Sequence, residues 1–191
     1  MLSLFLEVLP VSLLTGLIYT LYKLNKYKKK QEKFPVKKEI IRILFTVYVT
    51  GLISLTLLPQ NFWTYFYFHV KNGYCNETLA PIFSGGFNFI PSICKWLTGE
   101  FTFGSWVKTM LTLNMLMFVP YGIFVYLISG KLQFKNICTV SLIIPLFIEL
   151  FQPVIGRSFD IDDFILNSLG ILVGHYLAFL SHKIILKLRP W

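Results

Sequence analysis

The residues best suited to chemistry are ionisable and amide side chains in or beside long apolar segments. On insertion scales such a side chain costs roughly 2.5 to 3.5 kcal/mol inside a membrane span, so we expect each one to have a partner or a purpose. Carboxylates, amides and a guanidinium together can bind a polar headgroup, transfer a proton or form a structural clamp. In this sequence they are Asn114, Glu149, Gln152, Arg157, Asp160, Asp162, Asp163 and Asn167.

The spacing of the last of these residues predicts a helix stripe that faces protein. Asp163, Asn167, Gly170 and Gly174 follow one another at intervals of four, three and four, which places them on one helix face. The two glycines also form a small-xxx-small pattern that lets another helix approach closely. Asp160 precedes the stripe and is expected to cap the helix N-terminus.

Prolines are expected to shape the neighbouring helices. Glu149 and Gln152 are three residues apart, and Pro145 lies four residues before Glu149. A proline inside a helix removes a backbone hydrogen bond and kinks the helix, so Pro145 is expected to redirect the carboxylate. Pro120 is predicted to bend the preceding helix in the same way.

The elements that must position these side chains are predicted to be membrane-spanning helices. The 191-residue chain is 55% hydrophobic and only 14% charged, which leaves too little polar surface for a water-soluble globule. Four of its long apolar segments match the 17 to 25 residues that span a bilayer as a helix, and a fifth, with fifteen residues, is weaker but is extended past Pro153 by further apolar residues. We therefore predict an all-α integral membrane protein with about five spans, at residues 2–22, 40–58, 110–128, 137–151 and 164–180.

The distribution of lysine and arginine predicts the orientation of the chain. Of these 18 residues, 14 fall in residues 23–42, in residues 130–136 and in the C-terminal tail, which the five spans place on one side. Since such residues accumulate on the cytoplasmic side, we predict an outer N-terminus, a cytoplasmic C-terminus and a polar cluster at the outer face. Residues 23–39 are predicted to form a basic cytoplasmic linker, and residues 1–191 a single membrane domain.

The net charge of +9 is expected to serve contact with membrane lipids and not with nucleic acid. Its largest block lies beside predicted spans, where anionic headgroups attract it. The aromatic outer loop, residues 60–106, is expected to be partly embedded in the membrane, either as a lid or as an interfacial anchor. Within it, Cys75 and Cys94 could form a disulfide, and Asn76 begins a glycosylation triplet.

The ordered set of polar, proline and glycine residues resembles the VanZ-like family over residues 85–178. The segment Asn88, Phe89, Ile90, Pro91 looks like the family's Asn-Leu-Ile-Pro segment. The residues that carry the rest of the resemblance are Asn114, Phe118, Pro120, Gly122, Glu149, Gln152, Arg157, Asp160, Asp163, Asn167, Gly170 and Gly174.

This resemblance implies a multi-pass protein of a bacterial cell membrane, from a Gram-positive lineage, that lowers susceptibility to teicoplanin and related lipoglycopeptides. The leading hypothesis is a binding site for an amphiphile such as a lipid-linked cell-wall precursor or the drug itself. Arg157 and the amides would hold the headgroup, while kinked helices and loop aromatics would hold the lipid part. The predicted ligand-binding residues are Asn114, Glu149, Gln152, Arg157, Asp160, Asp163 and Asn167.

Three other functions stay open at this point. In an enzyme, Glu149 and Asp163 would act as general acid and base on an envelope lipid. In a transporter the same cluster would lie on a pathway, and in a structural clamp Arg157 would neutralise a carboxylate. We predict no cofactor and no metal, although the carboxylates could instead hold a divalent cation.

Overall fold

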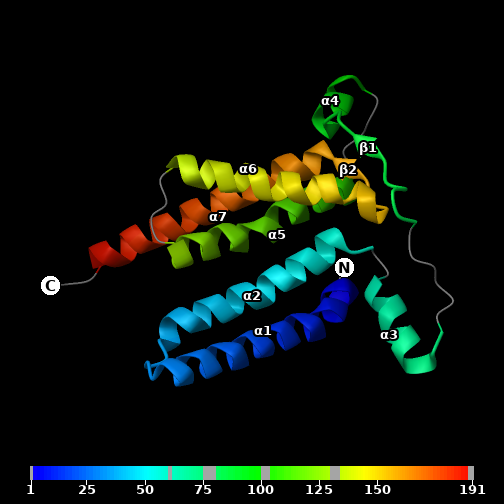
Figure 1. Ribbon diagram of the computed structural model, residues 1–191. Coiled ribbons are helices and arrows are strands. Elements are labelled where there is room, and N and C mark those ends of the chain that lie inside the picture. The colour runs from blue at the N-terminus through cyan, green and yellow to red at the C-terminus, as the bar shows by residue number, and fades with distance from the viewer. Residues whose placement is uncertain (1, 60–61, 75–80, 100–103, 130–133, 189–191) are drawn as a thin grey trace. The chain divides into compact units, whose positions relative to one another are not determined.

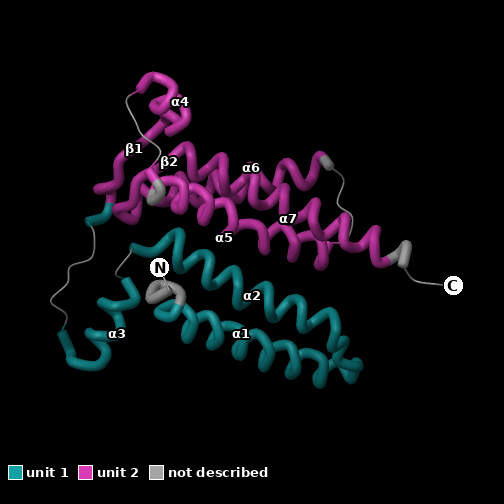
Figure 2. The backbone as a smooth tube through the Cα atoms, turned by 180° about the vertical axis from the view of Figure 1, so that it is seen from behind, with its two compact units in different colours: residues 1–82 teal, residues 83–191 magenta. Residues whose placement is uncertain are grey.

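The structure is a computed structural model built mainly of long helices (Figure 1). It divides into two compact units, residues 1–82 and residues 83–191 (Figure 2). The prediction of a single membrane domain stays a prediction, and each unit has its own packing. The described residues are 2–59, 62–74, 81–99, 104–129 and 134–188.

Four helices in the described part of the chain are long and apolar enough to cross a membrane. The first predicted span falls within α1 (Leu2–Lys30), which has 29 residues. It remains a prediction that α1 also crosses the membrane and that the N-terminus is outside. The four helices overlap the other predicted spans, and their bounds are Val36–Leu57, Val107–Ser129, Lys135–Ile155 and Ile161–Ile185.

Unit 1 is built on a hairpin of α1 and α2 (Val36–Leu57). The two helices come close at Gly16, where an added Cβ would overlap the side chain of Val47. Beside it, the Thr15 hydroxyl donates a hydrogen bond to the Thr50 hydroxyl over 3.0 Å. Small residues and hydroxyl pairs of this kind are typical of helix contacts within membranes.

The turn of this hairpin corrects the predicted basic linker. Residues 23–30 continue α1 as helix, so only residues 31–35 connect the two helices. Gln31 adopts a left-handed φ of 55° and donates its N–H to the carbonyl of Lys28, while the N–H of Glu32 bonds to the carbonyl of Tyr27. This pair of bonds is the Schellman helix end, which reverses the chain sharply. Lysine density and Pro35 are typical of a linker, but Pro35 immediately precedes α2 and does not interrupt either helix.

The aromatic residues near the start of the predicted loop, residues 60–106, form a helix, α3 (Phe62–Asn72), in unit 1. Its rings contact one another along the helix, and the centroids of Phe62 and Trp63 are 5.0 Å apart. The Tyr67 hydroxyl donates to the backbone oxygen of Glu7 over 3.0 Å, which attaches α3 to α1. Cys75 and the triplet from Asn76 lie outside the described residues, so the predicted disulfide and glycosylation site stay predictions.

Unit 2 is organised around α7 (Ile161–Leu188), which packs against both α5 (Ser105–Ser129) and α6 (Phe134–Phe151). A Cβ added at Gly122, Gly170 or Gly174 would overlap a backbone oxygen of the facing helix. The predicted close approach at the glycine stripe is therefore confirmed. Phe118 and Ile171 are fully buried in the same contact and form the centre of this packing.

A short irregular connection joins α6 to α7 and carries the polar turn. It contains a 3-10 helix, η1 (Pro153–Ile155), Gly156 with a left-handed φ of 80°, and the strand β2 (Phe159–Asp160). β2 pairs in parallel with β1 (Phe87–Asn88), and Asn88 lies opposite Asp160. Immediately after β1 comes α4 (Ser92–Leu97). Residues 87–97, called the docked loop below, thus lie on the connection between the last two helices.

Candidate functional site

The predicted ligand-binding residues belong to the elements at one end of the three long helices of unit 2, and Figure 1 shows these helices side by side. This end contains the N-terminal half of α5, the C-terminal end of α6 and the first turns of α7. The α6–α7 connection closes it. The predicted residues in these elements are Asn114, Glu149, Gln152, Arg157, Asp160, Asp163 and Asn167.

Glu149, near the end of α6, is the most deeply placed acid of the cluster, with none of its surface exposed. Its Oε2 accepts the backbone N–H of Asp160 over 3.2 Å. Its Oε1 is buried and has no hydrogen-bond partner among the described residues. Because a buried polar atom without a partner costs about 1–3 kcal/mol, this oxygen is a place where a donor would bind favourably.

Asp163 and Asn167 lie one turn apart on α7 and face α5. The Asn114 amide donates a short hydrogen bond to Asp163 Oδ1, which joins α5 to α7. Asn167 is 4% exposed, and its Oδ1 has no hydrogen-bond partner in the described part of the chain. Two buried acceptor oxygens, one on α6 and one on α7, are therefore left for a donor.

Asp160 and Asp162 have structural partners. Asp160 Oδ1 accepts the backbone N–H of Asp162 over 2.9 Å, so the predicted cap of α7 is confirmed. Its Oδ2 accepts the Asn88 amide over 3.2 Å. Asp162 Oδ2 accepts the backbone N–H of Ser92 over 2.9 Å. These two aspartates hold the docked loop in place, which accounts for them without a ligand.

Arg157 is half-buried in the connection between η1 and β2. Its backbone N–H donates to the carbonyl of Gln152 over 2.9 Å, and Gln152 is itself 4% exposed. Burial lowers the pKa of the Arg157 guanidinium, while the charges of Asp163 and Glu149 act to raise it. The guanidinium is therefore within electrostatic reach of both acids and supplies the one positive charge among the seven predicted residues.

A search against protein families matches residues 45–183 of the chain to the VanZ/LLP1 model. The chain belongs to the VanZ/LLP1 family. Searches of curated proteins and of solved structures found no significant match. The family resemblance predicted for residues 85–178 is confirmed, and it extends further toward the N-terminus than predicted, into α2.

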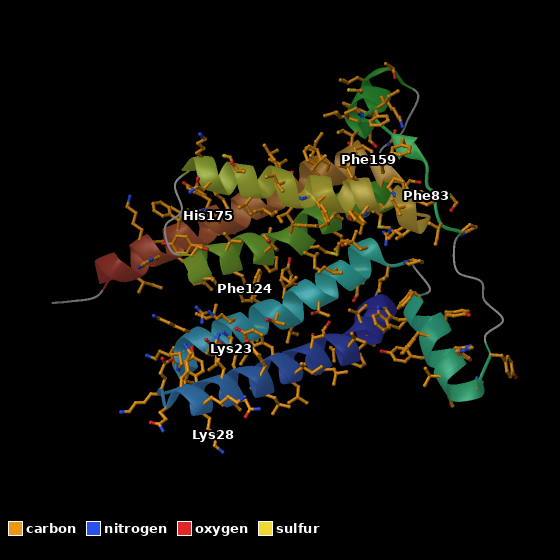
Figure 3. All side chains as sticks on the ribbon, viewed as in Figure 1. Lys23, Lys28, Phe83, Phe124, Phe159 and His175 are labelled. Carbon is orange, nitrogen blue, oxygen red and sulfur yellow. The ribbon has the colours of Figure 1, made fainter. Side chains whose placement is uncertain are left out.

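The whole polar cluster of this VanZ/LLP1 protein lies inside the matched region, whereas α1 and the start of α2 lie outside it. The docked loop contacts the helices at this cluster. Phe159 is 5% exposed, and its ring centroid lies 5.1 Å from that of Phe89 and 6.0 Å from that of Phe87 (Figure 3). Aromatic contacts and strand pairing thus hold the loop beside the site.

The residues of the docked loop were not part of the predicted ligand set, although they lie beside the cluster. Lys95 donates to Asn88 Oδ1 over 2.9 Å, and Asn88 in turn donates to Asp160. The only sequence signal for this arrangement was the resemblance of residues 88–91 to the family segment. Residues 88 and 160 are 72 positions apart, so no local pattern could pair them.

His175 lies near the middle of α7 and is labelled in Figure 3. Its ring meets the ring of Tyr126 edge-on, with centroids 5.3 Å apart, and its Nε2 has no hydrogen-bond partner among the described residues. Among the described residues, no group of three or more His, Cys, Asp or Glu side chains could hold a metal ion.

Proposed function

We propose that this VanZ/LLP1 protein binds the headgroup of an amphiphile, such as a lipid-linked cell-wall precursor, at its polar cluster. By this binding it would lower the susceptibility of a bacterial cell to teicoplanin-type lipoglycopeptides. The observation that carries the proposal is the pair of buried acceptors without donors, Glu149 Oε1 and Asn167 Oδ1. A buried site that lacks donors favours a ligand that brings them.

The chemistry of the cluster matches a headgroup that is both anionic and rich in hydroxyl or amide groups. Arg157 can pair with a phosphate through a charge-assisted hydrogen bond. Hydroxyl or amide hydrogens of the same headgroup would satisfy the free oxygens of Glu149 and Asn167. A sugar phosphate of a lipid-linked precursor carries both kinds of group, whereas a simple fatty acid carries neither the hydroxyls nor the amides.

An apolar surface beside the cluster is suited to the lipid part of such a ligand. The docked loop carries a run of large apolar side chains, each of them exposed by half or more of its surface. Exposed aromatic and aliphatic side chains of this kind lie favourably at headgroup depth. They are Phe87, Phe89, Ile90, Ile93, Trp96 and Leu97.

A second candidate function is acid–base catalysis on an envelope lipid. The unpartnered Oε1 of Glu149 would suit a carboxylic acid that donates a proton, with Asp163 as the companion base. In that case the bound amphiphile would be a substrate. Purified protein in liposomes separates the two functions, because an enzyme converts a labelled precursor to a new product and a binding protein only retains it.

The proposal is tested by drug susceptibility in a sensitive bacterial host. Teicoplanin and vancomycin are compared in cells that express the wild type, Glu149→Gln, Arg157→Ala or Asn167→Ala at matched membrane abundance. We expect the wild type to protect selectively against teicoplanin and the three variants to lose most of this protection. In binding assays each variant should weaken retention of the precursor by about tenfold, which corresponds to about 1.4 kcal/mol.

Matched controls change the same chemistry away from the cluster. Glu7→Gln removes a carboxylate in unit 1, and Lys183→Ala removes an exposed positive charge near the C-terminal end of α7. Both controls should protect like the wild type. Full protection by Glu149→Gln and Asn167→Ala would show that the cluster is a structural clamp, and the proposal would then be wrong.

A further inference from the structure

A basic hollow lies in unit 1, outside the region matched to the family. The last turns of α1 enclose a hollow of about 170 Å³. Three lysines on one side of the helix contribute to it, because positions 23, 26 and 30 follow at intervals of three and four. Its lining residues are Lys23, Lys26, Tyr27, Lys30 and Glu32.

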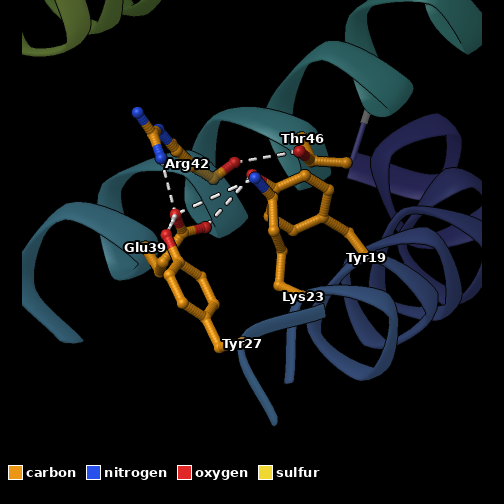
Figure 4. A network of polar contacts seen from close by, with 6 residues as sticks. All are labelled: Tyr19, Lys23, Tyr27, Glu39, Arg42 and Thr46. Atoms are coloured by element: carbon orange, nitrogen blue, oxygen red, sulfur yellow. Dashed lines mark hydrogen bonds and ion pairs between the residues drawn. The ribbon is translucent and has the colours of Figure 1, made fainter. Parts of the chain in front are cut away.

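The acid beneath this hollow is already neutralised. Glu39 is fully buried and accepts hydrogen bonds from Arg42, Tyr19 and Tyr27 (Figure 4). Lys23 lies 3.9 Å from the same carboxylate. Since Arg42 supplies a full positive charge at 2.5 Å, Glu39 does not cancel the other lysines of the hollow.

The two outer lysines of the hollow have no such partner. Among the described residues, Lys26 and Lys30 take part in no ion pair, and both are exposed. Glu32, which the helix end at Gln31 brings back toward Tyr27, is the one acid in the lining. The lining therefore carries three positive charges against one negative charge and would attract an anion.

An apolar stripe leads along α1 to this hollow. Leu14, Ile18 and Tyr22 precede Lys26 at intervals of four, so all four side chains lie along one face of the helix. The three apolar side chains are 55%, 57% and 60% exposed. An acyl chain can lie along such a stripe while its phosphate occupies the basic hollow, whereas a free anion would make no use of the stripe.

We propose that the hollow binds the phosphate of an anionic phospholipid. Lys26 and Lys30 hold the phosphate, and Lys23 and Tyr27, fixed by Glu39, shape the floor of the site. The stripe of Leu14, Ile18 and Tyr22 takes the acyl chain. This lipid site is independent of the proposed function, because it lies in a different unit and uses none of the residues of the polar cluster.

The experiment compares two double variants that remove the same charge. Lys26→Ala/Lys30→Ala changes the hollow, and Lys28→Ala/Lys29→Ala changes exposed lysines of the same helix that do not line it. Lys28 points away from α2 in Figure 3. Full-length protein in detergent is titrated with phosphatidylglycerol and with phosphatidylcholine, both labelled in the acyl chain.

We expect the hollow variant to bind phosphatidylglycerol about tenfold more weakly than the wild type and the control variant to differ by about twofold or less. Phosphatidylcholine should bind weakly and equally to all three proteins. The proposal fails if both double variants lose affinity equally, since the effect would then be one of overall charge. It also fails if soluble glycerol phosphate displaces phosphatidylglycerol as well as the unlabelled lipid does, because the site would then bind a free anion.

Discussion

Two glutamates are fully buried among the residues that the structure describes, and they have opposite surroundings. Glu39 in unit 1 accepts hydrogen bonds from two tyrosine hydroxyls and an arginine, with a lysine nearby (Figure 4). Glu149 in unit 2 accepts one backbone N–H, and its second oxygen has no partner in the described part of the chain. Both side chains are 0% exposed, so burial alone does not distinguish them.

The difference separates a buried carboxylate that serves the fold from one that we propose serves a ligand. A buried carboxylate whose two oxygens both accept hydrogen bonds stabilises the folded state and is held rigidly. One that lacks donors costs free energy until a ligand or a proton satisfies it. Glu39 therefore fastens the α1–α2 hairpin, and Glu149 belongs to the site at which we propose that an amphiphile binds.

The largest expected effect comes from leaving Glu39 without its arginine. Arg42→Met should lower the free energy of unfolding by about 3 kcal/mol, because a buried charge would lose its main partner. Lys28→Met, an exposed change of the same kind, should have little effect. Unfolding in mixed micelles with increasing SDS measures both. A loss below about 1 kcal/mol for Arg42→Met would mean that Lys23 alone can neutralise Glu39.

The same conservative change in the two glutamates should separate their roles. Glu39→Gln should cost about 2 kcal/mol of stability, since it weakens several hydrogen bonds to a charged group. Glu149→Gln should change stability by less than about 1 kcal/mol, because the folded state makes one hydrogen bond to its carboxylate. Each variant is unfolded beside the wild type in one micelle series. Equal losses for the two variants would contradict the comparison.

A smaller effect is expected at the cap of α7. Asp160→Ala should lower the free energy of unfolding by about 1 kcal/mol, because the N–H of Asp162 loses its acceptor. Asp160→Asn keeps an oxygen that can cap the helix and should retain most of this stability. The same unfolding assay applies. If Asp160→Ala and Asp160→Asn lose the same amount of stability, the charge of Asp160 matters and its capping geometry does not.

The cluster of unit 2 could be predicted in large part, and that of unit 1 could not. The stripe of Asp163, Asn167, Gly170 and Gly174 follows from the helical period, and the structure places the two glycines against α5 as predicted. Glu39 gave no comparable signal because it lies in a lysine-rich interval. Its donors, Tyr19 and Tyr27, are 20 and 12 positions away and reach it only through the hairpin turn.

By itself the sequence determined the helical membrane class, the close approach of another helix to the glycines of α7, the cap at Asp160 and the family. These depend on composition, on the spacing of residues within one helix and on a motif read in order. Only the tertiary structure decided which buried carboxylate has donors and that β1 pairs with β2 beside the site. The physical reason is that hydrogen bonds satisfy buried groups across long sequence separations, and no local period records those partners.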